Sequence, residues 1–165
     1  MNKLENYIVI DAARMEHAIH TAKELGSYYS CLYKGQSADD LENVAPYLFA
    51  FEKGSHFEKW YTENEWGNAS GLLIRTDVSF EVLYKHLRKF LWVETEDAHD
   101  LYFRFYDPRV LPMFLEICNA QQLNEFFGPV ENFICEDEEE KLGLFFSLKN
   151  NLLKTERISK KEIFS

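Results

Sequence analysis

The chain repeats one local pattern: a short apolar run, then a residue able to cap a helix, then a stretch with apolar residues at helical spacing. Residues 7–10 (YIVI) are followed by Asp11 and an amphipathic stretch. Residues 71–76 (GLLIRT) are followed by Asp77 or Ser79 as the cap and by the strongest amphipathic pattern of the chain. Strands and helices therefore alternate, but several connections are too short for crossovers. The sequence predicts an α/β or α+β fold with a mixed, mostly antiparallel sheet and flanking helices.

The remaining elements are expected from the same signals of spacing, caps and turns. Further strands are predicted at residues 27–33, 44–51, 92–94, 101–106, 130–135 and 142–148, and further helices at residues 56–64, after Asp107-Pro108, and at 119–127. With 165 residues, of which 46% are hydrophobic, the chain can build one core without a metal or a disulfide. We expect a single domain over residues 1–148 and a basic C-terminal tail over residues 149–165.

Composition excludes several classes of partner. The net charge of −10 would repel phosphate backbones, so it disfavours nucleic acid and favours a basic or mixed protein partner. No window approaches the roughly 18 consecutive apolar residues that span a bilayer, so no membrane role is expected. The N-terminus lacks a secretory pattern, and Cys31, Cys118 and Cys135 are odd in number and widely spaced. We expect reduced thiols in a cytoplasmic protein, with a Cys118–Cys135 disulfide as the alternative.

Motifs that would indicate catalysis or a cofactor are weak. His17, His20 and Glu24 fall on one helix face at a spacing that a metal site could use, but they lie on the polar side of an amphipathic helix, where solvation is the ordinary outcome. The glycines form no phosphate-binding loop, and no nucleophile elbow is present. The acidic run 136–140 is interpreted as a solvated loop between two strands. We therefore predict a protein that is not an enzyme and holds no cofactor.

Two clusters of basic and aromatic residues are candidates for contact with another protein, because arginine and tyrosine often anchor interfaces. One is the outer face of the predicted helix 80–91, with Lys85, Arg88 and Lys89. The other is one face of the predicted strand 101–106, with Tyr102, Arg104 and Tyr106. The alternative is that the helix face is merely solvated and that Arg104 is held inside the domain by Asp11, Asp77 or Asp107.

Residues 103–111 (FRFYDPRVL) resemble the signature of the domain-of-unknown-function 4123 family. Other segments resemble the family pattern in the same order along the chain, so that the resemblance spans about residues 7–135. They are residues 9–14 (VIDAAR), 44–48 (VAPYL), 66–67 (WG), 71–77 (GLLIRTD), 86–90 (HLRKF) and 126–130 (FFGPV).

The resemblance implies a type VI secretion adaptor, or effector chaperone, which binds a cognate toxic effector and helps to load it onto the VgrG spike. It carries over no catalytic residues. The charged positions inside the matched motifs are Asp11, Arg14, Arg75, Asp77, Arg104, Asp107 and Arg109. The alternative function is an immunity or antitoxin-like protein that masks a toxin.

We expect these charged residues to divide into two roles. In this hypothesis Arg14, Arg104 and Asp107 hold the fold through buried pairs, whereas Arg109, together with Lys85, Arg88 and Lys89, contacts a partner. Pro112 falls one turn after Pro108, so we also expect the helix that starts there to be kinked or very short.

Overall fold

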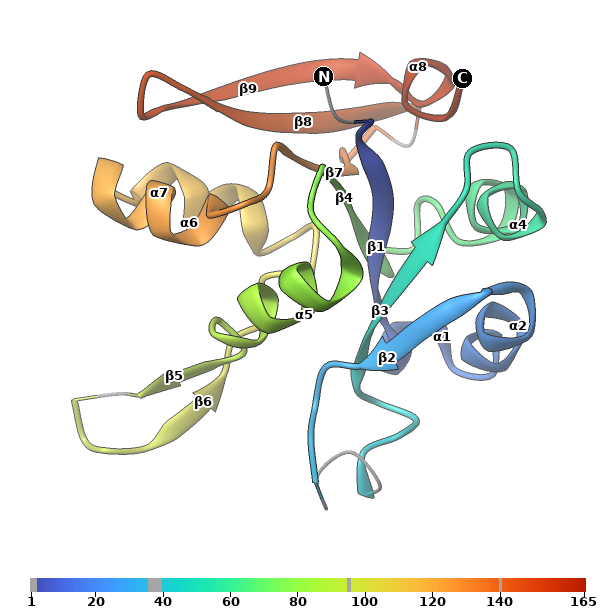
Figure 1. Cartoon of the computed structure of the whole chain (residues 1–165), viewed down its shortest axis with the longest axis horizontal. Helices are drawn as coiled ribbons and strands as arrows, with labels where there is room; N and C mark the ends of the chain where they lie inside the picture. The colour runs from blue at the N-terminus through green and yellow to red at the C-terminus, as the bar shows by residue number, and fades with distance from the viewer. Residues whose placement is uncertain (1–2, 36–39, 95, 140) are drawn as a thin grey trace.

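The sheet at the centre of the molecule has seven strands, and every pairing in it is antiparallel (Figure 1). The computed structural model describes residues 3–35, 40–94, 96–139 and 141–165. In spatial order the strands are β2 (Tyr28–Cys31), β3 (Pro46–Phe51), β1 (Glu5–Asp11), β4 (Gly71–Thr76), β7 (Asn132–Glu136), β8 (Leu142–Lys149) and β9 (Leu152–Ser159). The prediction of one domain with a mostly antiparallel sheet and flanking helices is confirmed.

Helices cover both faces of this sheet (Figure 1). One face carries α5 (Phe80–Arg88), α6 (Leu111–Ile117) and α7 (Ala120–Phe127), and the other carries α1 (Ala12–Met15), α2 (Ala18–Leu25), α4 (His56–Asn64) and α8 (Lys160–Phe164). Aromatic contacts join each layer to the strands. The ring centroids of Phe126 and Phe133 lie 5.0 Å apart on the first face, and those of Phe49 and Phe57 lie 5.2 Å apart on the second. The core therefore has two apolar layers, one on each side of the strands.

Side-chain caps begin several helices where the sequence predicts them. The Ser55 hydroxyl accepts from the backbone N–H of Glu58 at 3.2 Å at the start of α4. Ser79, rather than Asp77, caps α5, and Asn119 caps α7 in a capping box. These caps satisfy backbone donors that the first turn of a helix leaves without partners.

The amphipathic stretch that follows Asp11 forms two helices in the structure. Glu16 adopts a φ of 50° and separates α1 from α2. Met15 and Ile19 are both buried and stand four residues apart, so the apolar spacing continues across the break. Periodicity alone therefore could not reveal it.

The segment expected to be a basic tail, residues 149–165, is instead part of the sheet. Asn150 and Asn151 adopt φ values of 52° and 63° and form a two-residue turn that pairs β8 with β9. The following helix α8 buries Ile163, which is 2% exposed, and the Arg75 guanidinium donates to the Ile163 carbonyl at 2.9 Å. The domain boundary predicted at residue 148 is thus corrected: residues 149–165 complete the fold.

The signature segment 103–111 also differs from the prediction. A separate two-stranded sheet pairs β5 (Trp92–Glu94) with β6 (Asp100–Tyr102), and the chain leaves the extended form after Tyr102. The next helix, α6, begins at Leu111 rather than at Pro108. Pro112 therefore lies in the first turn, where a missing N–H removes no helical hydrogen bond, and of the two alternatives expected, kinked or very short, α6 is a short helix of seven residues.

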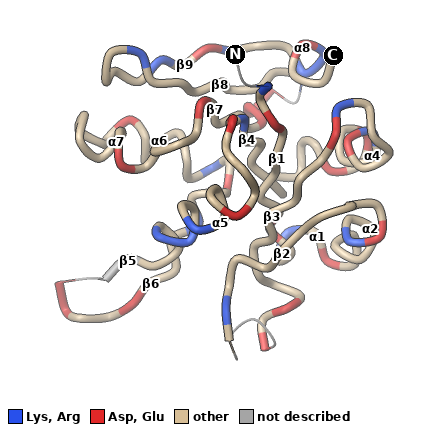
Figure 2. The backbone as a smooth tube through the Cα atoms, in the orientation of Figure 1, with Lys and Arg blue, Asp and Glu red and all other residues tan. Residues whose placement is uncertain are grey.

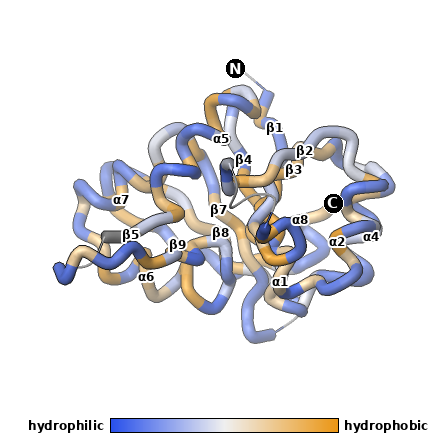
Figure 3. The backbone as a smooth tube through the Cα atoms, turned by 90° about the horizontal axis from the view of Figure 1, so that it is seen from below, coloured by the Kyte–Doolittle hydropathy of each residue, from blue (hydrophilic) through white to orange (hydrophobic). Residues whose placement is uncertain are grey.

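Two further sequence expectations concern cysteines and membranes. Cys31, Cys118 and Cys135 are all free, and Cys135 is buried in β7. Among the described helices, none has the length and apolar content needed to cross a membrane. Along the helices, polar and apolar stretches alternate (Figure 3), as amphipathic helices on a sheet require.

The C-terminal helix offers a test of its place in the core. We expect Ile163→Ala to lower the free energy of unfolding by about 2 to 4 kcal/mol, because it removes a buried side chain that packs on Gly143. Ile117→Ala is the matched control: this side chain is 82% exposed, so a change within about 0.5 kcal/mol is expected. Urea denaturation measures both. Equal effects of the two substitutions would show that α8 does not belong to the core.

Candidate functional site

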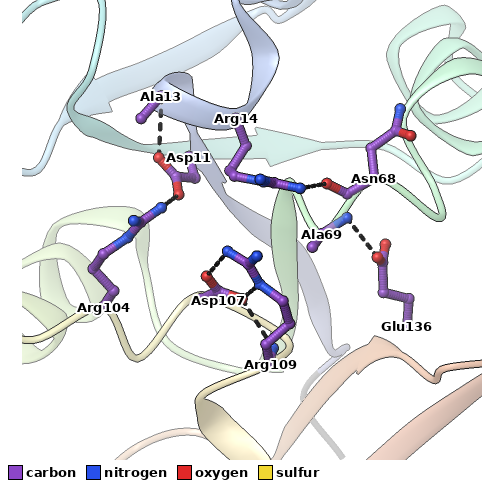
Figure 4. A network of polar contacts seen from close by, with 9 residues as sticks. All are labelled: Asp11, Ala13, Arg14, Asn68, Ala69, Arg104, Asp107, Arg109 and Glu136. Carbon is purple, nitrogen blue, oxygen red and sulfur yellow. Dashed lines mark hydrogen bonds and ion pairs between the residues drawn. The ribbon is translucent and has the colours of Figure 1, made fainter.

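A buried aspartate lies at the junction of β1 and α1. Asp11 is 1% exposed, and its Oδ1 accepts from the backbone N–H of Ala13 at 3.1 Å, which caps α1. Its Oδ2 accepts from the Arg104 guanidinium (Figure 4). Burial raises the pKa of Asp11 above its ordinary value, although the hydrogen bond from Arg104 acts in the opposite direction. Of the three partners proposed for Arg104, the structure selects Asp11.

A second ion pair lies within the signature segment itself. Both carboxylate oxygens of Asp107 accept from the Arg109 guanidinium, at 2.9 and 2.7 Å, and Oδ1 also accepts from the Arg109 backbone N–H. Asp107 is buried, whereas the Arg109 side chain is 57% exposed. Burial alone would raise the pKa of Asp107, but the hydrogen bonds from Arg109 hold it below its ordinary value.

A third carboxylate holds the loop that precedes β4. Glu136, at the end of β7, accepts from the backbone N–H groups of Gly67 and Ala69 at 2.8 and 2.5 Å. Gly67 has a φ of 101°, which glycine adopts readily, whereas Ala69 has a φ of 53°, which is unfavourable for a residue with a side chain, so the carboxylate stabilises a loop that is strained at Ala69. The Arg14 guanidinium donates to the carbonyl of Asn68 in the same loop (Figure 4). Burial raises the pKa of Glu136.

Arg109, Glu136 and the loop that Glu136 holds line a hollow of about 550 Å³, named here the α6 hollow. One wall comes from the signature segment and the start of α6, a second from the loop before β4, and a third from the ends of β7, β8 and β9. The residues concerned are Pro108, Arg109, Pro112 and Met113, then Gly67 and Ala69, then Glu136, Asp137, Glu138, Leu144 and Arg157. Apolar and charged side chains thus share one concave surface, which is typical of binding sites.

A further aspartate–arginine pair lies on the third wall. The Asp137 side chain is 7% exposed and its Oδ2 lies 3.1 Å from Nε of Arg157, whose side chain is 65% exposed. The Oδ1 of Asp137 accepts from the Glu138 backbone N–H at 2.8 Å. The hollow therefore has an arginine on each of two walls, and each arginine is paired with a buried carboxylate.

The structure brings some of the predicted site residues together and separates others. Asp11, Arg14, Arg104, Asp107 and Arg109 lie near one another in a network of polar contacts (Figure 4), and of these Arg109 lines the α6 hollow. Arg14 is exposed and binds a carbonyl, so it does not form the buried pair expected of it. Arg109, which we expect to be available to a partner, is 57% exposed and also binds Asp107.

The basic face of α5 lies elsewhere (Figure 2). Lys85 and Lys89 are exposed there. Arg88 is half-buried, and its Nε donates to the Leu32 carbonyl at 2.8 Å, so it helps to hold the segment after β2.

The other predicted positions serve the fold or lie apart. Arg75 binds the Ile163 carbonyl, and burial lowers its pKa, whereas Asp77 is exposed after β4. The predicted face of Tyr102, Arg104 and Tyr106 is not continuous, because Tyr106 is 2% exposed. Within the described ranges, no group of three histidine, cysteine or acidic side chains is placed to hold a metal ion.

Sequence reasoning missed Glu136 and Asp137. Both were assigned to a solvated acidic loop, but Glu136 is the last residue of β7 and is buried. For Glu136 the available signal is its position directly after the apolar run 133–135, because the strand continues through residue 136; Asp137 lies just beyond the strand. Glu140 lies outside the described residues.

A protein-family model described as "Domain of unknown function (DUF4123)" matches residues 6–125. The chain belongs to this family. The matched region contains Asp11, Arg104, Asp107 and Arg109, and it ends within α7, so β7, β8, β9 and α8 of this DUF4123 protein lie beyond it. Searches of curated proteins and of solved structures found no match.

The role of Glu136 can be tested by its removal. We expect Glu136→Ala to destabilise the protein by about 2 to 4 kcal/mol, because two backbone N–H groups lose their acceptor, and Glu136→Gln to have a smaller effect because it keeps one oxygen. Chemical denaturation gives the values. Glu125→Ala on the exposed side of α7 is the control, with a change within about 0.5 kcal/mol. If Glu136→Ala matched this control, the loop would not depend on Glu136.

The Asp107–Arg109 pair predicts a pH dependence. Because the pKa of Asp107 is lowered in the folded state, its ionisation contributes stability that is present above the ordinary value of 3.8 and is lost as pH falls through the folded pKa. We therefore expect the free energy of unfolding at pH 7 to be about 1 kcal/mol higher for the wild type than for Asp107→Asn. The difference is modest because Arg109 is solvated. The difference should persist to about pH 5 and decline as pH falls below 3.8 and through the folded pKa of Asp107. Denaturation across this range measures it, and a difference that grew in acid would contradict the assignment.

Proposed function

We propose that this DUF4123 protein is a cytoplasmic type VI secretion adaptor, which binds a cognate effector and helps to load it onto the VgrG spike without catalysing a reaction. Membership of the family supports the proposal, together with the resemblance of residues 103–111 to the signature of such adaptors. The partners are then proteins, with no role for nucleic acid, membrane or cofactor.

The observation that carries the proposal is the place of the signature segment. Its residues Pro108 and Arg109 form a wall of the α6 hollow, and α6 continues from it with two strongly exposed apolar side chains. Met113 is 65% exposed and Ile117, one turn further along the helix, is 82% exposed. Exposed apolar groups beside an arginine are typical of the centre of a protein interface.

An adaptor that joins two proteins needs two separate contacts. The first is the α6 hollow with Arg109, which we assign to the effector. The second is the face of α5 with Lys85, Arg88 and Lys89, which we assign to the spike. Each is small, and contacts of modest area suit an adaptor that must release its cargo.

The proposal can be tested by affinity capture from the native cell with tagged full-length protein, followed by mass spectrometry. We expect wild type to retain one toxic effector together with a spike protein, and to stay in the cells when the effector is secreted. Met113→Lys should reduce effector recovery at least about tenfold, because it places a charge in the apolar part of the hollow. Leu152→Lys is the matched control, since Leu152 is 69% exposed on β9, away from the lining.

The other outcomes separate the alternatives. Recovery of a toxin alone, inactive while bound, would replace the adaptor function with that of an immunity protein, which the acidic net charge of −10 also suits. Recovery of neither effector nor spike would overturn the proposal.

A further inference from the structure

Asp137 has a buried oxygen without a hydrogen-bond donor. Its Oδ2 is inaccessible to solvent and accepts no hydrogen bond from any described residue. The Arg157 guanidinium lies at ion-pair distance, 3.1 Å, but none of its N–H groups is aimed at this oxygen. A buried carboxylate oxygen in this condition is costly, and a well-directed donor would stabilise it.

The rest of the α6 hollow combines an apolar surface with carboxylates, and a long basic side chain is complementary to both. Leu144, Met113 and the two prolines form an apolar surface, while Glu136 and Glu138 lie beside Asp137. Each Glu136 oxygen already accepts one backbone N–H and retains a second lone pair. Arginine and lysine combine an apolar stem with a cationic end, so both parts would find a counterpart here.

The charges of the lining favour a cation over an anion. Three carboxylates, of Glu136, Asp137 and Glu138, face two guanidinium groups, of Arg109 and Arg157. The charge of Arg109 is also neutralised by its ion pair with the buried carboxylate of Asp107. An incoming anion would therefore have to compete with Asp107 for Arg109, and would also approach the carboxylates of Glu136, Asp137 and Glu138.

We propose that the α6 hollow receives one basic side chain, arginine or lysine, from a segment of the partner protein, and that Asp137 is its main acceptor. The identity of that partner as the effector rests on the function proposed above. Arg157, which is 65% exposed and poorly directed, covers Asp137 in the unbound protein and is displaced by the incoming group. Asp137 and Arg157 thus act in opposite directions on binding.

Substitutions at Asp137 and Arg157 are expected to change peptide binding in opposite directions, and unfolding of a variant could not produce the tighter binding. The probe is the peptide acetyl-Leu-Arg-Leu-amide, titrated into ¹⁵N-labelled full-length protein and followed through the amide signals of Gly67, Ala69 and Glu138. We expect saturable shifts at these residues, and binding that is at least about tenfold weaker for acetyl-Leu-Gln-Leu-amide. Asp137→Asn should weaken binding of the arginine peptide by about tenfold, and Arg157→Gln should tighten it by about threefold. Asp97→Asn, with the same change of charge at an exposed position, should leave it unchanged.

The proposal is overturned if the arginine and glutamine peptides bind alike, if neither shifts these amides, or if Arg157→Gln weakens binding. Effector capture by the Asp137→Asn protein distinguishes failure of the basic-residue site from failure of the adaptor function. Undiminished capture would remove the basic-residue site while leaving the adaptor intact. If wild type captures no effector but still binds the arginine peptide, the site stands and the adaptor function falls.

Discussion

The contact on which the site most depends is the one between Asp11 and Arg104. Asp11 ends β1, the third strand in the order of the seven, and its two oxygens have different tasks: one caps α1 and the other binds Arg104. Because β1 is paired on both sides, the carboxylate is fixed by the centre of the sheet. Arg104 in turn fixes the start of the signature segment, from which Arg109 and α6 extend toward the hollow. Arg104 thus ties the start of that segment to the same carboxylate that caps α1.

The same arrangement occurs three times around the site. In each pair the carboxylate is buried and the arginine is partly solvated: side-chain exposures are 1% and 41% for Asp11 and Arg104, 3% and 57% for Asp107 and Arg109, and 7% and 65% for Asp137 and Arg157. The fold fixes the position of the acid, and the acid in turn fixes the arginine, whose guanidinium is partly solvated and whose stem covers apolar groups. A carboxylate left buried without its arginine would be strongly unfavourable. Each surface arginine is therefore held in place because its departure would leave a buried carboxylate without a counter-ion.

Much of the fold follows from local signals, and the exceptions share a physical cause. The strands β1 and β4 and the helices α4, α5 and α7 were predictable because their apolar spacing agrees with a capping residue. By contrast, β9 reads as a tail, since most of its residues are exposed on an edge strand that offers no alternation of polar and apolar side chains. The Asp11–Arg104 pair was among the alternatives the sequence allowed, but the choice among three acids depends on tertiary packing. Glu136 was missed because its backbone partners, Gly67 and Ala69, lie 69 and 67 positions away.

The α6 hollow joins two parts of the chain with different relations to the family. The wall of Pro108, Arg109 and α6 lies inside the matched region, which ends at residue 125, whereas Glu136, Asp137, Leu144 and Arg157 lie beyond it. The first wall is tied to β1 through Arg104 and cannot change without disturbing the core. In the second, Leu144 and Arg157 are carried by the hairpin of β8 and β9 at the edge of the sheet, where substitutions alter the lining more than the fold, whereas Glu136 ends β7 and holds the loop before β4. If one wall is constrained by the fold and the other only in part, a shared scaffold can present different acceptors to different partners. The residues that would set partner choice in this protein are then those beyond the matched region, with Asp137, just after β7, and Arg157 on β9 foremost.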